Sequence, residues 1–279
     1  MPPPDDEHAN VPVPAYMLDV QPPLHRDRIR RGASTIVRPF TALTPIVARS
    51  VRDALKGSRR SPSTLTVTAA LGRELMIELP PAAIETWIPD RIYDGSVVRR
   101  LSDAFVDHHD WSGIERPVET DHVFHEMRDL VALRTRFHEG ASYCYLMEMA
   151  ERGVPILRNC VRLDSKVRIS SYFESYLPLI DDIERNGYRM QRRRFSRLDE
   201  VGVAIGSNGS PRRFLGGRHR FGIVRALNLD RIPAQVKLCH RDWLADLASY
   251  RGEPPITALR QWLREHREPR VCRQAFANG

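Results

Sequence analysis

The chain has 279 residues, of which 42% are hydrophobic and 28% charged, a composition typical of a folded protein with one large or two smaller domains. It contains no apolar run of about 18 residues, and its first residues are acidic and proline-rich. A membrane span and a secretory signal are therefore not predicted, and the expected location is cytoplasmic.

The net charge of +8 allows two interpretations. A basic protein can have an anionic partner such as DNA. However, only three of the 43 basic residues are lysine, so the charge can also reflect a general preference for arginine at exposed sites. Both interpretations stay open on composition alone.

The four cysteines are not arranged as metal ligands. Cys144, Cys160, Cys239 and Cys272 form no CxxC unit, so we expect reduced thiols and no structural zinc site. The sequence also contains no P-loop, no GxGxxG and no GxSxG motif, which leaves nucleotide-binding P-loop folds, Rossmann dehydrogenases and serine hydrolases without support.

The first half of the chain is predicted to begin with a disordered, proline-rich arm over residues 1–24. Apolar spacing predicts a short helix over Pro45 to Leu55. Later elements follow from short apolar runs separated by glycine and proline. They are a hairpin over residues 65–79, a strand over 84–93, a short helix over 97–106 and a loop over 107–121.

The middle of the chain is predicted to be helical. Apolar residues at helical spacing indicate helices over 122–137 and 143–152, and a third over 173–186. Gly187 follows the third helix, where a glycine commonly adopts the left-handed conformation that ends a helix.

The last third combines β and α patterns. Val201, Val203 and Ile205 alternate with small residues, and Asn208-Gly209 is a strong hairpin signal. The return strand is expected to include Phe214-Leu215. The remaining predictions are a helix over 218–227, a strand over 232–238 and helices over 240–250 and 256–267.

One motif indicates a chemical task. Gly216 and Gly217 stand where the strand pattern gives way to a helix, and Arg218, His219 and Arg220 fall in the first helical turn. A helix N-terminus exposes backbone N–H groups and the positive end of the helix dipole. With cationic side chains beside it, this arrangement predicts an anion site.

The order helix, glycine, hairpin, GGxHR, helix and "LxLxxIPxxV" over residues 179–238 resembles the ParB/sulfiredoxin superfamily. Gly217-Arg218-His219-Arg220 matches the Gly-Glu-Arg-Arg box of ParB proteins and the Gly-Cys-His-Arg box of sulfiredoxins. The likeness is greater to uncharacterised prokaryotic members with a GxHR box, whose ending is matched by His240-Arg241-Asp242-Trp243.

The resemblance implies an α+β fold, with a mixed sheet, helices and an N-terminal arm. The implied organisation is an N-terminal segment over 25–83, a ParB/sulfiredoxin-like domain over 84–245 with a helical insertion at about 94–170, and a C-terminal helix and tail over 246–279.

The resemblance also implies a ligand, ATP or CTP with Mg²⁺. Gly216 and Gly217 would allow close backbone approach, Arg220 would contact phosphate, and His219 would contact or orient it. Arg218 stands where sulfiredoxins have their cysteine, so reduction of cysteine sulfinic acid is disfavoured, and Arg218 is either a further phosphate contact or exposed. Only about 40 residues follow Leu238, which disfavours DNA clamping of the centromere type.

Carboxylates for acid–base chemistry or Mg²⁺ are available at Asp181, Asp182 and Glu184. They also fit a solvated helix face, since apolar residues beside them supply the buried face. Arg192-Arg193-Arg194 either extends the anion site or forms a surface loop.

Histidines offer a weaker hypothesis. His122 and His125 are three residues apart on a predicted helix, and His108-His109-Asp110 precede them, but no HExxH-type signature exists. No metal site is predicted. His240 and Trp243 are expected to pack against the domain.

Three functions follow. The first is a nucleotide-binding protein, a phosphotransferase or NTPase if it is an enzyme, with Arg220 and His219 on phosphate and Glu184 or Asp181 as acid–base group. The second is a non-enzymatic, DNA-associated protein that uses its arginine-rich surface. The third is an interaction module in which the box is only structural.

Overall fold

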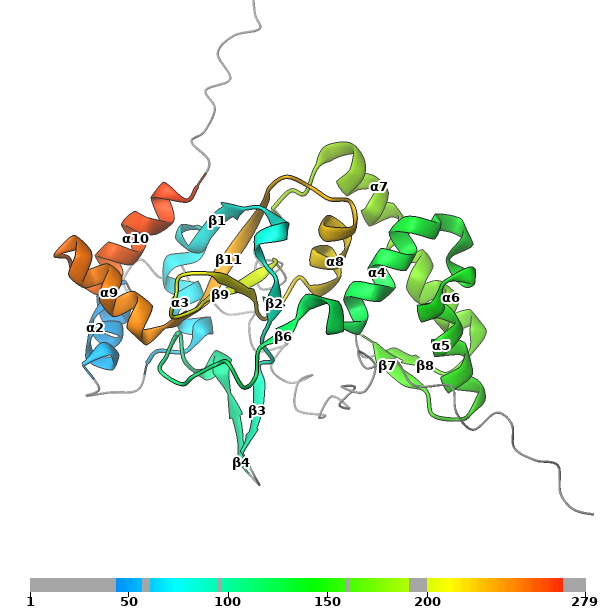
Figure 1. Cartoon of the computed structure of the whole chain (residues 1–279), viewed down its shortest axis with the longest axis horizontal. Coiled ribbons are helices and arrows are strands. Elements are labelled where there is room, and N and C mark those ends of the chain that lie inside the picture. Colours follow the sequence, from blue (N-terminus) through cyan, green and yellow to red (C-terminus); the bar gives the residue numbers. More distant parts are fainter. Residues whose placement is uncertain (1–43, 57–60, 95–96, 159–160, 191–199, 268–279) are drawn as a thin grey trace, which may run out of the picture.

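The computed structural model describes residues 44–56, 61–94, 97–158, 161–190 and 200–267 (Figure 1). Its fold is α+β, as expected, with one large mixed sheet and two short hairpins. The strands of the large sheet, in spatial order, are β1 (Met76–Leu79), β11 (Ile232–His240), β9 (Gly202–Ile205), β10 (Pro211–Arg213), β2 (Thr86–Trp87) and β6 (Arg116–Pro117).

The strand directions create a shared carboxyl edge. β9 and β5 (Val106–Asp107) both run parallel to β11, with Ile205 and Val106 opposite Cys239. β1 is antiparallel to β11, and β10 is antiparallel to β9. The C-terminal ends of β5, β9 and β11 therefore meet at one edge of the sheet, where ligands often bind in parallel sheets.

Helices flank the sheet at both ends (Figure 1). One group contains α2 (Thr44–Leu55), α3 (Thr64–Leu71), α9 (Arg241–Arg251) and α10 (Pro255–Glu265). The other contains α4 (His122–Leu133), α5 (Ala141–Glu151), α6 (Lys166–Glu174) and α7 (Leu177–Asn186). The hairpins are β3 (Arg91–Asp94) with β4 (Val97–Arg100), and β7 (Ile156–Arg158) with β8 (Val161–Leu163).

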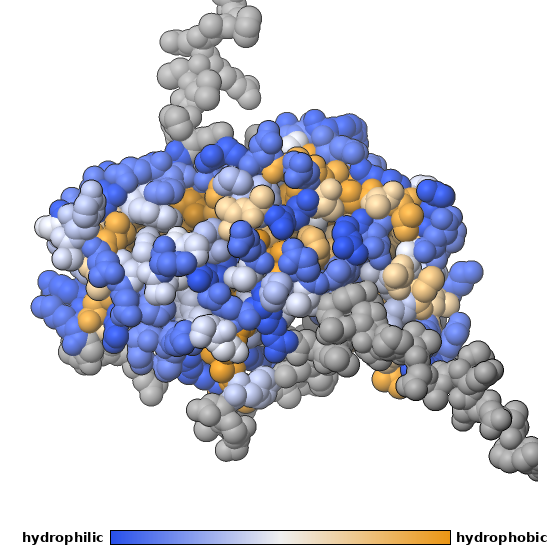
Figure 2. Space-filling model, viewed as in Figure 1, coloured by the Kyte–Doolittle hydropathy of each residue, from blue (hydrophilic) through white to orange (hydrophobic). Residues whose placement is uncertain are grey.

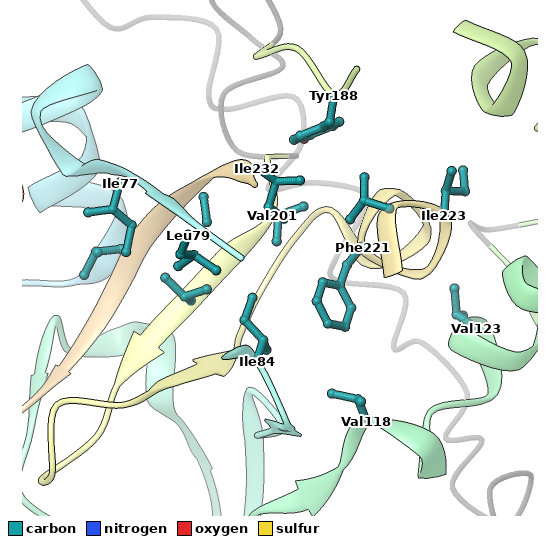
Figure 3. Packing of buried hydrophobic residues seen from close by; sticks show 14 of the residues in the cluster. Ile77, Leu79, Ile84, Val118, Val123, Tyr188, Val201, Phe221, Ile223 and Ile232 are labelled. Carbon is teal, nitrogen blue, oxygen red and sulfur yellow. The ribbon is translucent and has the colours of Figure 1, made fainter. Parts of the chain in front are cut away.

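α8 (Arg218–Ala226) joins the sheet to the second helical group. Figure 3 shows Phe221 on α8 directed toward Ile84 and Val118, with Val123 of α4 nearby. The α8–α4 contact is close because Gly222 has no side chain: a Cβ there would lie 2.9 Å from Cβ of Met127. This packing fixes the first turn of α8 relative to the first turn of α4.

The surface seen in Figure 2 is mainly hydrophilic, with apolar patches in the upper part of the view, over the region of α7 and α8. Among the described residues, every helix is too short or too polar to cross a bilayer.

Several predicted elements are confirmed. The helices predicted over 45–55, 143–152, 218–227, 240–250 and 256–267 correspond to α2, α5, α8, α9 and α10. The hairpin at Asn208-Gly209 is also confirmed, with Gly209 at φ 79°. Gly187 ends α7, as its position predicted, and has a positive φ of 69°, but its ψ of 168° is not that of the left-handed helical conformation.

Two predictions were wrong. Residues 65–71 form a helix, not a strand, because Ser63 caps it by accepting a hydrogen bond from the backbone N of Thr66 at 3.2 Å. Residues 97–106 form β4, a 3₁₀ turn and the start of β5, not a helix, because β4 pairs with β3 and β5 with β11. Helix capping in the first segment, and strand pairing in the second, selected the secondary structure that these residues adopt.

Three further predictions were partly correct. The helix over 122–137 is α4 followed by a 3₁₀ turn over 134–139. The helix over 173–186 is divided into α6 and α7, and the first turn of α7 contains Pro178, a residue that favours this position. The strand over 84–93 is interrupted between β2 and β3, where Pro89 lies. The arm over residues 1–24 is outside the described part of the chain.

Candidate functional site

The turn that opens α8 is built from three consecutive residues with positive φ. Leu215, Gly216 and Gly217 have φ values of 47°, 87° and 59°. For a non-glycine residue such as Leu215 this conformation costs about 1–2 kcal/mol. A Cβ on Gly217 would lie 2.5 Å from the backbone N of Val201. The glycine therefore lets the turn pack directly against the start of β9.

The buried side chain of Lys237 donates a hydrogen bond to this turn. Its side chain is 1% exposed, and its Nζ donates to the carbonyl oxygen of Leu215 at 2.8 Å and of Glu200 at 3.4 Å. A buried ammonium group needs such acceptors. Because Lys237 lies on β11, its hydrogen bond connects the opening turn of α8 to a central strand of the sheet.

No side chain caps α8, because its N-cap residue is Gly217. The first N–H groups of an α-helix have no acceptor within the helix, and the dipole places partial positive charge there. The first intrahelical bond closes with the N–H of Phe221 on the carbonyl of Gly217 at 2.8 Å. The turn thus has the geometry of an anion-binding helix terminus.

Arg218 points from this turn to the start of α4. Its Nε donates to both oxygens of Asp121 at 2.8 Å, and its Nη2 lies 2.6 Å from Oδ1. Asp121 is 3% exposed and also caps α4 by accepting from the backbone N of Val123 at 2.9 Å. Burial alone would raise the pKa of Asp121, but the charges of Arg218 and Arg213 hold it well below its usual range. Asp121 is therefore an anion that joins the two helix starts.

Arginines also surround Trp87. The guanidinium carbons of Arg116, Arg213 and Arg218 lie 5.9, 5.5 and 5.8 Å from its ring centroid, within cation–π range. Arg213 is buried, and its Nε has no hydrogen-bond partner among the described residues. Burial lowers the pKa of Arg213 to about 10. The negative charge of Asp121 opposes this change, and the positive charge of Arg218 adds to it. It therefore stays charged at neutral pH.

A second buried network connects α8 to α4 and α6. Arg158 donates from Nε and Nη2 to Oε1 of Glu126 at 2.9 and 2.8 Å. The hydroxyl of Tyr172 donates to Oε2 of Glu126 at 2.5 Å and lies 3.0 Å from Nε2 of His219. Because the only proton of Tyr172 is given to Glu126, its oxygen must accept from Nε2–H of His219. This assigns the lone pair of the His219 ring to Nδ1.

His122 and His219 are neutral in this network. Burial and the charge of Arg218 lower the pKa of His122 to about 2 and that of His219 to about 3. The His219 ring also stacks on Tyr176, with centroids 4.6 Å apart and planes 9° apart. His219 is thus a fixed, uncharged hydrogen-bonding group in the first turn of α8.

Arg220 acts on a different set of residues from Arg218 and His219. Its charge acts on Tyr188, whose hydroxyl donates to Oε2 of Glu200 at 2.6 Å. Burial, together with the negative charge of Glu200, raises the pKa of Tyr188 far above its usual range. Tyr188 also lines a cavity of about 450 Å³ together with Arg189 and Arg231, a volume in the range of small-molecule sites.

The structure therefore divides the predicted anion site. Gly216 and Gly217 form the turn, and the charge of Arg220 acts on Tyr188, which lines the cavity. Arg218 and His219 instead face α4 and α6, where their hydrogen bonds are made to Asp121 and Tyr172.

The carboxylates predicted for acid–base chemistry lie elsewhere. Asp181 and Glu184 are on the exposed side of α7, with side chains 52% and 54% exposed, and both pair with Arg134, at 3.6 and 2.8 Å. Asp182 accepts a hydrogen bond from Asn186 at 2.7 Å. Arg192-Arg193-Arg194 lies outside the described residues.

Sequence reasoning missed most of the buried cluster, namely Asp121, Glu126, Arg158, Tyr172 and Arg213. Asp121 gave a usable signal, because an Asp directly before a predicted helix is a typical N-cap. The other four are distant in sequence, and only the packing of α4, α6, β7 and β10 brings them together.

Comparison with protein-family profiles, curated proteins and solved structures finds no match to this chain.

Proposed function

We propose that this chain binds a nucleotide, ATP or CTP with Mg²⁺, and that its phosphates sit at the opening turn of α8. The observation that carries the proposal is the glycine-opened first turn of α8, which no side chain caps and which includes Arg220. Phosphate groups favour helix N-termini because free N–H groups and the dipole both attract them.

The charge balance around the turn supports an anionic ligand. Among the described residues, Arg158, Arg213 and Arg218 form ion pairs with two carboxylates, those of Asp121 and Glu126. With His122 and His219 neutral, the cluster has a surplus of positive charge behind the turn. Arg218 is largely committed to Asp121, so Arg220 is the side chain we assign to phosphate.

The order of elements supports the proposed ParB/sulfiredoxin-like fold. The β9–β10 hairpin is followed by the glycine turn, then α8 and then β11, which is the order that the resemblance implies over residues 179–238. Within that framework, neutral His219 would orient the ligand by accepting, at Nδ1, a hydrogen bond from a hydroxyl or amino group of the nucleotide, and would not attract phosphate by charge.

Phosphotransfer or NTP hydrolysis is the enzymatic form of the proposal. It requires a carboxylate near the phosphates, as base or Mg²⁺ ligand. Asp181 and Glu184 remain predictions for that role, but they are paired with Arg134 on the outer side of α7. Glu200 lies closer to the turn, since a Cβ on Gly217 would be 2.8 Å from the carbonyl carbon of Glu200.

Calorimetric titration of ATP and CTP with Mg²⁺ tests the proposal. Arg220→Ala should weaken binding by about tenfold or more, the contribution of a hydrogen bond to a charged group. Arg225→Ala is the matched control, because Arg225 lies at the other end of α8 and pairs with Glu119 at 3.7 Å. A folded wild type that binds neither nucleotide would refute it. Salt-dependent binding of duplex DNA in that case would favour the DNA-associated alternative.

A further inference from the structure

A second cluster lies at the opposite edge of the sheet. The opening turn of α8 packs against Val201, and the next residue, Gly202, is opposite Gln235 on β11. Asp107, in contrast, is opposite His240 at the end of β11. Five residues of strand separate these two levels, or about 16 Å. The cluster therefore lies at the carboxyl edge of β5 and β11, distinct from the opening turn of α8.

The cluster contains metal-ligand chemistry. Asp107, His108 and His109 each offer one ligand atom, and these atoms lie within 4.8 Å of one another. Oδ1 of Asp107 and Nδ1 of His109 are 2.8 Å apart. Two ligands that bind one zinc ion at about 2.0–2.1 Å in tetrahedral geometry lie about 3.3 Å apart. Small side-chain adjustments would suffice, because both histidines are exposed.

Asp107 is held in the orientation that such a site needs. It is 3% exposed, and its Oδ2 accepts from Nε1 of Trp111 at 2.8 Å, which turns Oδ1 toward the histidines. Although burial raises its pKa, hydrogen bonds from Trp111, His109 and Arg99 keep the pKa of Asp107 below its usual value. Metal ligands commonly have an outer partner of this kind.

A cation already occupies the centre of the cluster. Nη1 of Arg99 lies 2.8 Å from Oδ1 of Asp107 and 2.6 Å from Nδ1 of His109. Arg99 comes from the β3–β4 hairpin, and its side chain is 34% exposed, so it can move into solvent. Oδ1 of Asp107 thus already attracts a positive charge.

A small cavity adjoins the cluster. It has a volume of about 150 Å³ and is lined by Trp111 and His240, together with Asp110, Ser112 and Arg212. His240 also lies against the cluster, with Nε2 3.2 Å from the carbonyl oxygen of His109. A three-ligand metal site beside a polar cavity leaves a coordination position for water or a small polar ligand.

We propose that Asp107, His108 and His109 bind a divalent transition metal, Zn²⁺ in the first instance, in exchange with the guanidinium of Arg99. One carboxylate and two imidazoles are a donor set that suits zinc, cobalt and nickel, and not magnesium. This site is independent of the proposed nucleotide site.

The test is equilibrium binding of Zn²⁺ to the full chain, with Co²⁺ as a spectroscopic probe. Wild type should bind, and His108→Ala should weaken binding at least about tenfold. Arg99→Ala should bind about two- to fivefold tighter, because a partly exposed ion pair contributes little energy and its loss removes the competitor. His138→Ala, at an exposed histidine outside the cluster, should leave binding unchanged.

The cobalt spectrum separates this site from binding by cysteine. Coordination by the cluster gives visible bands without thiolate-to-cobalt charge transfer, since its donors are nitrogen and oxygen. Circular dichroism checks that each variant is folded. If His108→Ala binds as tightly as wild type, or if Arg99→Ala binds no metal, the cluster is only a structural ion-pair network and the proposal is wrong.

Discussion

Replacing Arg218 by methionine tests whether Asp121 is a buried anion held by two arginines. Arg218 provides the closest contacts to Asp121, at 2.6–2.8 Å, whereas Arg213 remains at 3.6 Å. Removing one partner of a buried ion pair typically costs 3–5 kcal/mol. Because Arg213 remains, we expect the lower limit, about 3 kcal/mol, which corresponds to a fall of roughly 6–12 °C in Tm for a chain of this size.

The pH dependence of this loss identifies its cause. In wild type the depressed pKa of Asp121 contributes stability above its unfolded value of about 3.9, and this is lost as pH falls through the folded value. In Arg218→Met the folded pKa rises toward the unfolded value, so only wild type loses this stability as pH falls below about 4. The Tm difference between variant and wild type should therefore be smaller at pH 3 than at pH 7.5.

A double variant supplies the control. Asp121→Asn combined with Arg218→Met removes the charge together with its closest partner. It should recover only part of the lost stability, because the buried carboxylate is gone but Arg213 loses its ion-pair partner. Thermal unfolding followed by circular dichroism gives all the values. A loss below about 1 kcal/mol in Arg218→Met, as for an exposed pair, or a loss that does not change with pH, would refute this account of Asp121.

Three further predictions concern the same region. Gly217→Ala should destabilise by at least about 2 kcal/mol more than Gly153→Ala, because both have positive φ but only Gly217 is packed against backbone; equal melting temperatures would contradict this. Tyr172→Phe should cost about 1–3 kcal/mol, since it removes the donor to Glu126, and an unchanged Tm would contradict it. Because burial lowers the pKa of His122 and His219 to about 2 and 3, both should stay neutral by NMR down to pH 5. The free energy of unfolding should decrease as the pH is lowered below about 6.5, by up to 1.4 kcal/mol per pH unit for each histidine. Binding of phosphate should raise the pKa of His219.

The sequence predicted the elements whose signals are local. The β9–β10 hairpin follows from Asn208-Gly209, and the start of α8 follows from Gly216-Gly217, where the positive φ and, at Gly217, the close packing against Val201 favour glycine. Helices with a clear apolar stripe, such as α10, were also predicted. The α+β class follows from these elements together.

Other features depended on contacts between distant segments. Residues 65–71 were predicted to be a strand because they form a short apolar run before Gly72, yet the Ser63 cap and burial of Val67 and Leu71 in the core produce α3. The buried cluster needed the same distant contacts, since Glu126, Arg158 and Tyr172 meet only when α4, β7 and α6 pack. Asp181 and Glu184 were selected because they are acidic and close in sequence, but proximity in sequence did not place them at the turn.

Calorimetric titration of ATP and CTP with Mg²⁺ into wild type and Arg220→Ala tests the central claim most directly. The account predicts saturable binding of at least one nucleotide to wild type, at least about tenfold weaker in Arg220→Ala and unchanged in Arg225→Ala. Equal loss in both variants would show that general surface charge, and not the opening turn of α8, binds the ligand. No binding to a folded wild type would contradict the proposed function itself.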